Sequence, residues 1–131
     1  MKMSDQELYQ EFIIELFKNP LNYGSISDAD YKAEMYNTAC GDRIVIYIRV
    51  KDGIIVDAKH DGMGCAISQA SASLFTEHIR GKTLEETKKL GKDDVLKLLK
   101  LDLSRNPTRM RCALLPLDAF RKAVKAPESG K

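Results

Sequence analysis

The spacing of apolar residues near the N-terminus predicts a helix that buries one face. Ser4 and Glu7 have the spacing of a capping box, in which two side chains satisfy free backbone N–H groups at a helix start. The apolar positions that follow lie four residues apart and are Leu8, Phe12 and Leu16. Because Pro20 cannot continue a helix, we expect this one to end at Asn19.

Residues 43–59 carry the strongest strand pattern, since apolar and polar residues alternate there. The alternating apolar positions are Ile44, Ile46, Ile48 and Val50. The pair 52–53 is Asp-Gly, which is typical of a type I′ turn, and the β-branched run 54–56 follows it. We therefore expect a hairpin with one face buried under helices and with Tyr47 on the other face. The run 32–37 predicts a preceding strand.

Helical spacing returns after the hairpin. Residues 60–64 contain two glycines and are typical of a loop, whereas small apolar residues after Cys65 keep helical spacing as far as Gly81. We therefore expect Cys65 at or near a helix start. Thr83 and Glu86 form a second capping box and predict a short helix.

Two further helices complete the pattern. Gly91 is expected to end the short helix, and Asp93 or Asp94 to cap another that runs to Leu99.

A polar break at 104–110 precedes the last amphipathic helix, which we expect to begin at Cys112. Pro116 would then lie in its first turn, where the missing N–H does no harm. The tail 127–131 is expected to fray.

The element order is one helix, three strands and then only helices, which predicts an α+β fold. In this fold an N-terminal helix precedes a three-stranded antiparallel sheet, and the C-terminal helices pack on one face of the sheet. A chain of 131 residues predicts a single domain, 1–131, with an ordered core at 4–126. The glycine-rich phosphate fingerprints of dinucleotide- and nucleotide-binding folds are absent from the sequence.

Charge and hydropathy argue against nucleic acid and membrane partners. Lys and Arg number 21 and Asp and Glu 19, which leaves a net charge of +2. The lysines at 88, 89, 97 and 100 alternate with acidic residues, as on a solvated helix face. Apolar stretches are only a few residues long, so we expect no membrane span and a cytoplasmic protein.

The cysteines are the main candidates for chemistry. Cys40, Cys65 and Cys112 all fall at junctions between predicted elements. Isolated cysteines are often small core residues, but Cys40 and Cys65 have glycine and polar neighbours. A thiol at a helix N-terminus is favoured as thiolate, and Arg109 and Arg111 would add to this effect at Cys112. A metal or reactive-thiol site is the alternative to core packing.

Three short motifs carry a family resemblance. They are Ala39-Cys40-Gly41-Asp42, Gly62-Met63-Gly64-Cys65-Ala66-Ile67-Ser68 and Arg111-Cys112-Ala113-Leu114. In this order around a central hairpin they resemble the NifU N-terminal/IscU/SufU family of iron–sulfur cluster assembly proteins. The resemblance implies that Cys40, Cys65 and Cys112 are thiolate ligands and that Asp42 is a carboxylate ligand that makes the site labile. Such donors suit Zn²⁺ or a transient [2Fe–2S] cluster. The alternative for Asp42 is an exposed turn residue.

Two departures leave the subgroup open. IscU-type proteins have a His before the last cysteine and a Leu-Pro-Pro-Val-Lys segment for a dedicated Hsp70 chaperone, whereas this chain has Arg111 and the segment 105–109, Arg-Asn-Pro-Thr-Arg. The sequence therefore gives no support to such a chaperone. An Arg at this position resembles SufU, but the spacing between Cys65 and Cys112 is too short for the insertion that SufU-type proteins carry.

The leading hypothesis is a scaffold and sulfur acceptor. A cysteine desulfurase would give persulfide sulfur to Cys112, with Cys40 as the rival acceptor, and Arg111 would activate the thiolate. An iron donor and downstream Fe–S acceptor proteins would be the other partners.

Three alternatives remain. They are a SufU-like zinc-dependent sulfurtransferase with the same site residues, a structural zinc-binding interaction domain, and a cysteine hydrolase. A hydrolase needs a His as base, and neither His60 nor His78 lies in a recognisable catalytic motif, so we expect both histidines to be structural.

Overall fold

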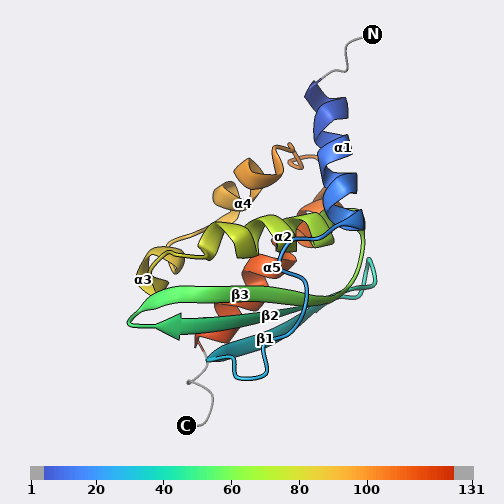
Figure 1. The fold of residues 1–131 in the computed structure, drawn as a ribbon. Coiled ribbons are helices and arrows are strands. Elements are labelled where there is room, and N and C mark those ends of the chain that lie inside the picture. The colour runs from blue at the N-terminus through green and yellow to red at the C-terminus, as the bar shows by residue number, and fades with distance from the viewer. Residues whose placement is uncertain (1–4, 126–131) are drawn as a thin grey trace.

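The computed structural model describes residues 5–125 and has the predicted α+β order. The elements are α1 (Asp5–Lys18), β1 (Tyr31–Asn37), β2 (Asp42–Lys51), β3 (Ile54–Met63), α2 (Ala66–Ile79), α3 (Leu84–Thr87), α4 (Lys92–Leu99) and α5 (Pro107–Lys125). Figure 1 shows the helices gathered over one face of the sheet. The predicted cap at Ser4 and the predicted tail 127–131 lie outside the described residues.

The sheet is antiparallel in the order β1-β2-β3. Its hairpin turn has positive φ angles at Asp52 (54°) and Gly53 (78°), as a type I′ turn requires. Strand β3 continues to Met63, because Asp61 and Gly62 still pair with β2, so the prediction of a loop at 60–64 is wrong for its first four residues. The longer strand carries the chain to the start of α2.

The inner face of β2 forms the centre of the core. Ile44, Ile46 and Ile48 are fully buried there, and α2 and α5 cover them. Phe75 of α2 meets Phe120 of α5 edge to face, with ring centroids 5.3 Å apart. Fully burying one such side chain stabilises the fold by about 1.5–3 kcal/mol.

The other face of the sheet is not bare. Val45 and Tyr47 point away from the helices but are buried, because Ile26 from the loop between α1 and β1 packs over them. The period of two in β2 correctly places Tyr47 opposite the helices. It could not reveal the cover, since the loop itself has no periodic pattern.

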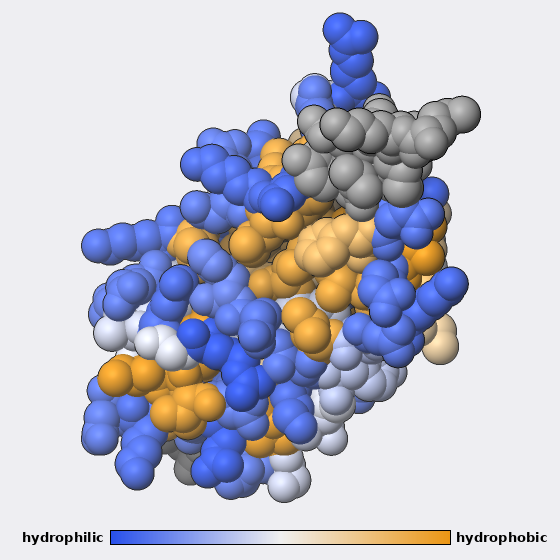
Figure 2. All heavy atoms as spheres, turned by 45° about the horizontal axis from the view of Figure 1, so that its top comes forward, coloured by the Kyte–Doolittle hydropathy of each residue, from blue (hydrophilic) through white to orange (hydrophobic). Residues whose placement is uncertain are grey.

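Helix α1 packs on α2 through a narrower stripe than the sequence suggests. Ile13 and Leu16 are buried, whereas Phe12, which was expected in the buried stripe, is 40% exposed. A groove of about 400 Å³ runs beside α1 and is lined mainly by apolar residues, which are Ile13, Ile14, Ile67, Leu101 and Leu103. Figure 2 shows apolar side chains at the surface next to this helix. No helix among residues 5–125 is long and apolar enough to cross a membrane.

Two helix boundaries differ from the prediction. Gly91 does not end α3, which stops at Thr87. It is the N-cap of α4, where the side chain of Asp94 accepts a hydrogen bond from the Gly91 N–H at 2.8 Å. Helix α5 begins at Pro107, five residues before Cys112, with Asn106 Oδ1 accepting from the N–H of Arg109. An Asn cap followed by Pro at the first helical position is a favourable helix start.

Pro116 therefore lies inside α5 and not in its first turn. Because proline has no N–H, the carbonyl of Cys112 lacks its usual helical donor. The hydroxyl of Ser71 on α2 donates a 2.5 Å hydrogen bond to the next carbonyl, that of Ala113. Helix α2 thus supports α5 where its own hydrogen-bond ladder is interrupted.

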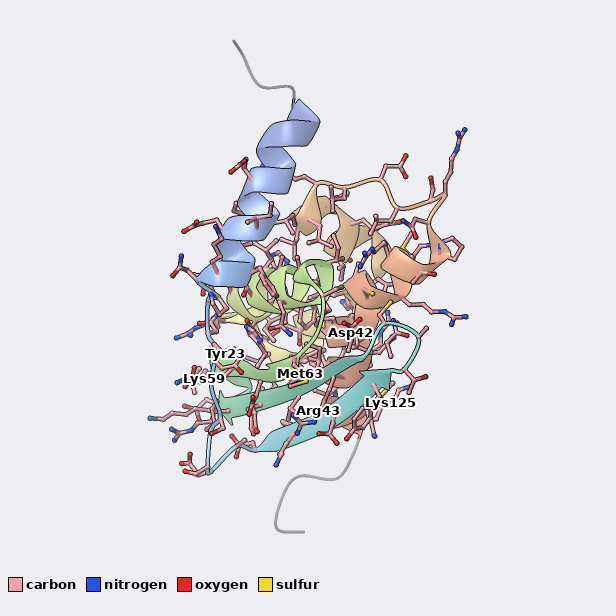
Figure 3. All side chains as sticks on the ribbon, turned by 90° about the vertical axis from the view of Figure 1, so that its right-hand side faces the viewer. Tyr23, Asp42, Arg43, Lys59, Met63 and Lys125 are labelled. Atoms are coloured by element: carbon pink, nitrogen blue, oxygen red, sulfur yellow. The ribbon has the colours of Figure 1, made fainter. Side chains whose placement is uncertain are left out.

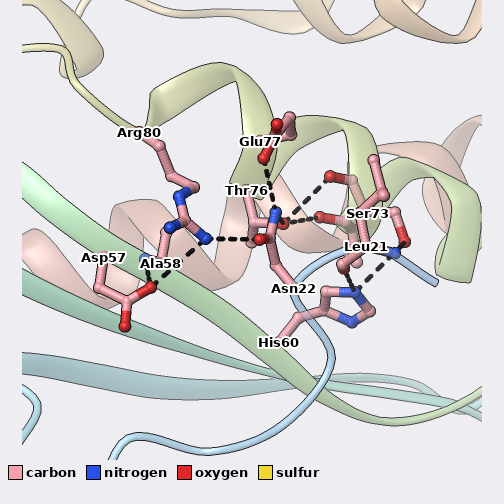
Figure 4. Close-up of polar contacts among 10 residues, drawn as sticks. Leu21, Asn22, Asp57, Ala58, His60, Ser73, Thr76, Glu77 and Arg80 are labelled. Atoms are coloured by element: carbon pink, nitrogen blue, oxygen red, sulfur yellow. Dashed lines mark hydrogen bonds and ion pairs between the residues drawn. The ribbon is translucent and has the colours of Figure 1, made fainter.

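His60 is a structural residue, as expected. Its ring is buried, with Nε2 2.8 Å from the carbonyl oxygen of Leu21 and 3.3 Å from the Ser73 hydroxyl (Figure 4). Tyr23 packs edge to face on the ring, and Asn22 bonds Thr76 on α2. These contacts pin the loop that covers the outer face of the sheet.

Burial lowers the pKa of His60, so acid should weaken the fold. In the unfolded chain the imidazole binds a proton below about pH 6.5, while the buried ring resists protonation, so stability is complete above that pH and falls as the pH drops below it. The free energy of unfolding is measured with urea between pH 7 and 5. Its decrease per pH unit should be smaller in His60→Gln than in the wild type, by up to ~1.4 kcal/mol. His78→Gln is the comparison variant: burial lowers the pKa of the less buried His78 as well, so its substitution should reduce the slope less than His60→Gln does. Equal slopes in wild type and His60→Gln would contradict the assignment.

Candidate metal centre

The loop between β1 and β2 places two candidate ligands. Asn37 and Asp42 pair across the strands at its base, and Cys40 lies in the loop with a partly exposed thiol. Gly41 has a φ of 69°, and a side chain there would meet nothing within 4 Å. Glycine is therefore needed at this position for the left-handed turn and not for a close approach of chains.

Asp42 is buried with only 2% of its surface exposed, so the alternative of an exposed turn residue is wrong. One carboxylate oxygen, Oδ1, accepts from the N–H of Cys65 at 2.8 Å and from the Ser68 hydroxyl at 3.3 Å. Gly64 makes this approach feasible, since a Cβ there would collide with both Asp42 Oδ1 and Ser68 Oγ. The other oxygen, Oδ2, is buried and has no hydrogen-bond partner among the described residues. A buried carboxylate oxygen without a donor is available to a cation.

Cys112 brings the third donor from the opposite side. Its Sγ is fully buried and lies 3.2 Å from the Sγ of Cys40. The ligand atoms of Cys40, Asp42 and Cys112 all lie within 4.8 Å of one another. Figure 3 shows Asp42 at the start of β2, on the side of the sheet that faces the helices. Two thiols and a carboxylate this close form a donor set that fits a thiophilic divalent metal.

Cys65 stands at the edge of this group. It is the N-cap of α2, which confirms its expected place at a helix start, and its Sγ lies 3.9 Å from Ser68 Oγ. Its sulfur does not join the 4.8 Å group, but it is near enough to Cys112 to affect the pKa of that thiol. The structure therefore brings together three of the four residues that the resemblance implied and places the fourth beside them.

The environment of Cys112 differs from the one expected. Because α5 starts at Pro107, Cys112 is not at a helix N-terminus and gains no stabilisation there. Burial raises the pKa of the Cys112 thiol, and its contacts with Asp42, Cys40 and Cys65 raise it further. Without a bound cation, this sulfur holds its proton.

The cation that faces the thiols is Arg109 and not Arg111. Interaction with Cys65, which includes a hydrogen bond, raises the pKa of Arg109, and the nearby Cys112 and Cys40 add to this effect. Arg111 is an exposed residue of α5. Arg109 precedes Cys112 by three residues, which puts both on one helix face, so helical spacing alone could have identified it once the helix start was known.

An α+β domain that gathers thiols, a buried carboxylate and a guanidinium at one end of its sheet defines a class of small metal- or cluster-binding proteins. This chain belongs to the NifU-like N terminal domain family, which it matches over residues 8–129.

Two relatives differ in their described roles. The chain is 39% identical over 117 residues to "Iron-sulfur cluster assembly scaffold protein IscU 1" of Archaeoglobus fulgidus, covering 89% of this chain and 74% of that protein. It is 36% identical over 138 residues to "Zinc-dependent sulfurtransferase SufU" of Bacillus subtilis, covering 94% and 93%. A solved structure, a putative iron–sulfur cluster assembly scaffold protein for the SUF system from Fervidobacterium islandicum, is similar with a TM-score of 0.74 and 31% identity, covering 92% of this chain and 99% of that one.

The placement of the two arginines generates a direct comparison. Three thiolates and a carboxylate around a divalent cation leave net negative charge, which the Arg109 guanidinium offsets. Arg109→Ala should weaken zinc binding about 10-fold, as outer-shell changes do. Arg111→Ala is the matched control on the same helix turn and should leave the affinity unchanged. Zinc affinity is measured by competition with a chromophoric chelator, and a larger loss in Arg111→Ala would contradict this assignment.

Proposed function

We propose that this protein is a scaffold for iron–sulfur cluster assembly, which receives sulfur from a cysteine desulfurase and builds a labile [2Fe–2S] cluster at Cys40, Asp42, Cys65 and Cys112. The observation that carries the proposal is the buried carboxylate of Asp42, with Oδ2 unpartnered beside two thiols. The scaffold role described for the archaeal relative agrees with this donor set.

The cluster is the cargo of such a protein, and the donors suit transient holding. Thiolates bind iron firmly, whereas a carboxylate is a harder and weaker partner for a thiophilic centre. With Oδ1 of Asp42 committed to Cys65 and Ser68, one oxygen remains to contact the cluster. A site with one weak ligand favours release to an acceptor protein.

Exposure favours Cys40 as the sulfur acceptor over Cys112, which the sequence had favoured. Cys40 is partly exposed in a loop, while Cys112 is buried and has a raised pKa. The Cys40 thiolate would attack the outer sulfur of the desulfurase persulfide. The donor S–S bond breaks, the desulfurase cysteine leaves as thiolate, and a persulfide forms on Cys40. Sulfide for the cluster then requires two electrons from a thiol or ferredoxin-type reductant.

A zinc-dependent sulfurtransferase is the second candidate, because SufU shares the family and the same donors fit Zn²⁺. The alignments by themselves do not separate the two candidates. The archaeal alignment covers 117 positions, which equals 89% of this chain and so needs no inserted residues. The SufU alignment extends over 138 positions, and that with "Iron-sulfur cluster assembly scaffold protein IscU" of Thermotoga maritima over 132. Both exceed the 131 residues present here, so relatives of both kinds have residues that this chain lacks.

The partners follow from the chemistry of the proposal. A desulfurase supplies sulfur, an iron donor supplies metal, and Fe–S acceptor proteins receive the cluster. Free thiols of this kind persist in a reducing compartment, so we place the protein in the cytoplasm. Anaerobic purification with iron and acid-labile sulfide analysis tests the scaffold role, since zinc alone would favour the sulfurtransferase.

The two cysteines should separate in a persulfide assay. We expect Cys40→Ser to lose the mass increase of one sulfur atom after incubation with a cysteine desulfurase and cysteine, while Cys112→Ser keeps it. Mass spectrometry of the intact protein measures both variants, with Cys65→Ser as the matched control. Persulfide uptake that survives in Cys40→Ser and disappears in Cys112→Ser would show that the buried thiol is the acceptor.

Asp42 should control how long a cluster stays bound. Removing the weak oxygen ligand in Asp42→Ala leaves a thiolate-dominated site, so the visible absorption of a reconstituted cluster should decay several-fold more slowly in the presence of a chelator. Asp93→Ala, on the exposed start of α4, is the control. If Asp42→Ala lost its cluster as fast as the Cys→Ser variants, the carboxylate would be a required ligand and not a labilising one.

A further inference from the structure

Asn37 is a buried polar residue that neither the motifs nor the expected ligand set includes. It is the last residue of β1 and is 8% exposed. In the register of the sheet it pairs with Asp42, and its side chain shares the inner face of β1 with Ala33 and Met35. A carboxamide at this position faces the helices and needs a hydrogen-bond partner there.

That partner is the sulfur of Cys112. The amide nitrogen Nδ2 lies 3.6 Å from Cys112 Sγ, within the range of an N–H···S hydrogen bond. Because Cys112 is fully buried, water cannot replace this donor. The two residues at the base of the loop between β1 and β2 thus have different roles. Asn37 donates a hydrogen bond to the proposed ligand Cys112, and Asp42 is itself a proposed ligand.

The helical hydrogen bonding of the backbone is interrupted at Cys112, where this side-chain contact is made. Pro116 deprives the Cys112 carbonyl of its helical donor, so α5 restrains this residue less than a regular helix would. A side-chain hydrogen bond to the sulfur restores the restraint at the atom that would bind metal. Donors to metal-bound sulfur also reduce the electron density that the thiolate gives to the metal.

We propose that Asn37 is a positioning residue that orients the Cys112 sulfur and moderates its donor strength toward bound metal. The inference rests on the proposed function in one respect, that Cys112 is a ligand. The Asn37 amide nitrogen, which lies next to the sulfur, carries protons and has no free lone pair, so this atom acts on Cys112 and not on the metal.

Cobalt and zinc provide the probes. Asn37→Ala should move the thiolate-to-cobalt charge-transfer band of the Co²⁺-loaded protein to longer wavelength, because a thiolate without its N–H donor is more electron-rich. Zinc affinity, measured by chelator competition, should fall about 10-fold. Asn37→Asp keeps the shape, removes the donor and adds negative charge, so its band should shift further in the same direction. Thr38→Ala, at the exposed neighbouring position, is the matched control and should change neither quantity.

The melting temperature of each metal-free variant separates a local effect from unfolding. A band shift with an unchanged melting temperature supports the positioning role, and Asn37→Asp carries the same test if Asn37→Ala fails to fold. Wild-type spectrum and affinity in both Asn37 variants would overturn the inference while leaving the proposed function intact. Failure of the wild-type protein to bind Co²⁺ or Zn²⁺ through sulfur would overturn both.

Discussion

One hydrogen bond, from the backbone N–H of Cys65 to Oδ1 of Asp42, joins the sheet to the helices at the site. It fixes the carboxylate, occupies one of its two oxygens and holds the start of α2 against the start of β2. Gly64 is required because any side chain there would occupy the space of this contact. The position of α5, and with it Cys112, follows from the core that α2 and α5 share.

The same end of the fold separates the thiols by exposure. Cys112 is inside the core, Cys65 caps a helix, and Cys40 lies in a loop that reaches solvent. A buried thiol suits permanent holding, while a partly exposed thiol suits exchange with a partner protein. Arg109 and Asn37 then act on the sulfurs as a charge and as a hydrogen-bond donor. The site therefore combines a rigid part with an accessible one.

Sequence reasoning succeeded where the signal was local and periodic. The alternation in β2 and the turn at 52–53 predicted the hairpin, because both are set by neighbouring residues. The start of α5 was missed, since its first turn is exposed and polar and shows no apolar period, although the Asn-Pro cap was present. The contact between Asn37 and Cys112 joins residues 75 positions apart, which no local pattern encodes. The grouping of the ligands came only from the family resemblance.

The central claim is that three cysteines and one aspartate form a single centre. X-ray absorption spectroscopy of the zinc-loaded protein tests it most directly, because it counts sulfur and oxygen neighbours of the metal. The account predicts three sulfurs at about 2.3 Å and one oxygen at about 2.0–2.2 Å, with Cys65 moving into the group formed by Cys40, Asp42 and Cys112. Two or fewer sulfurs around zinc would contradict it.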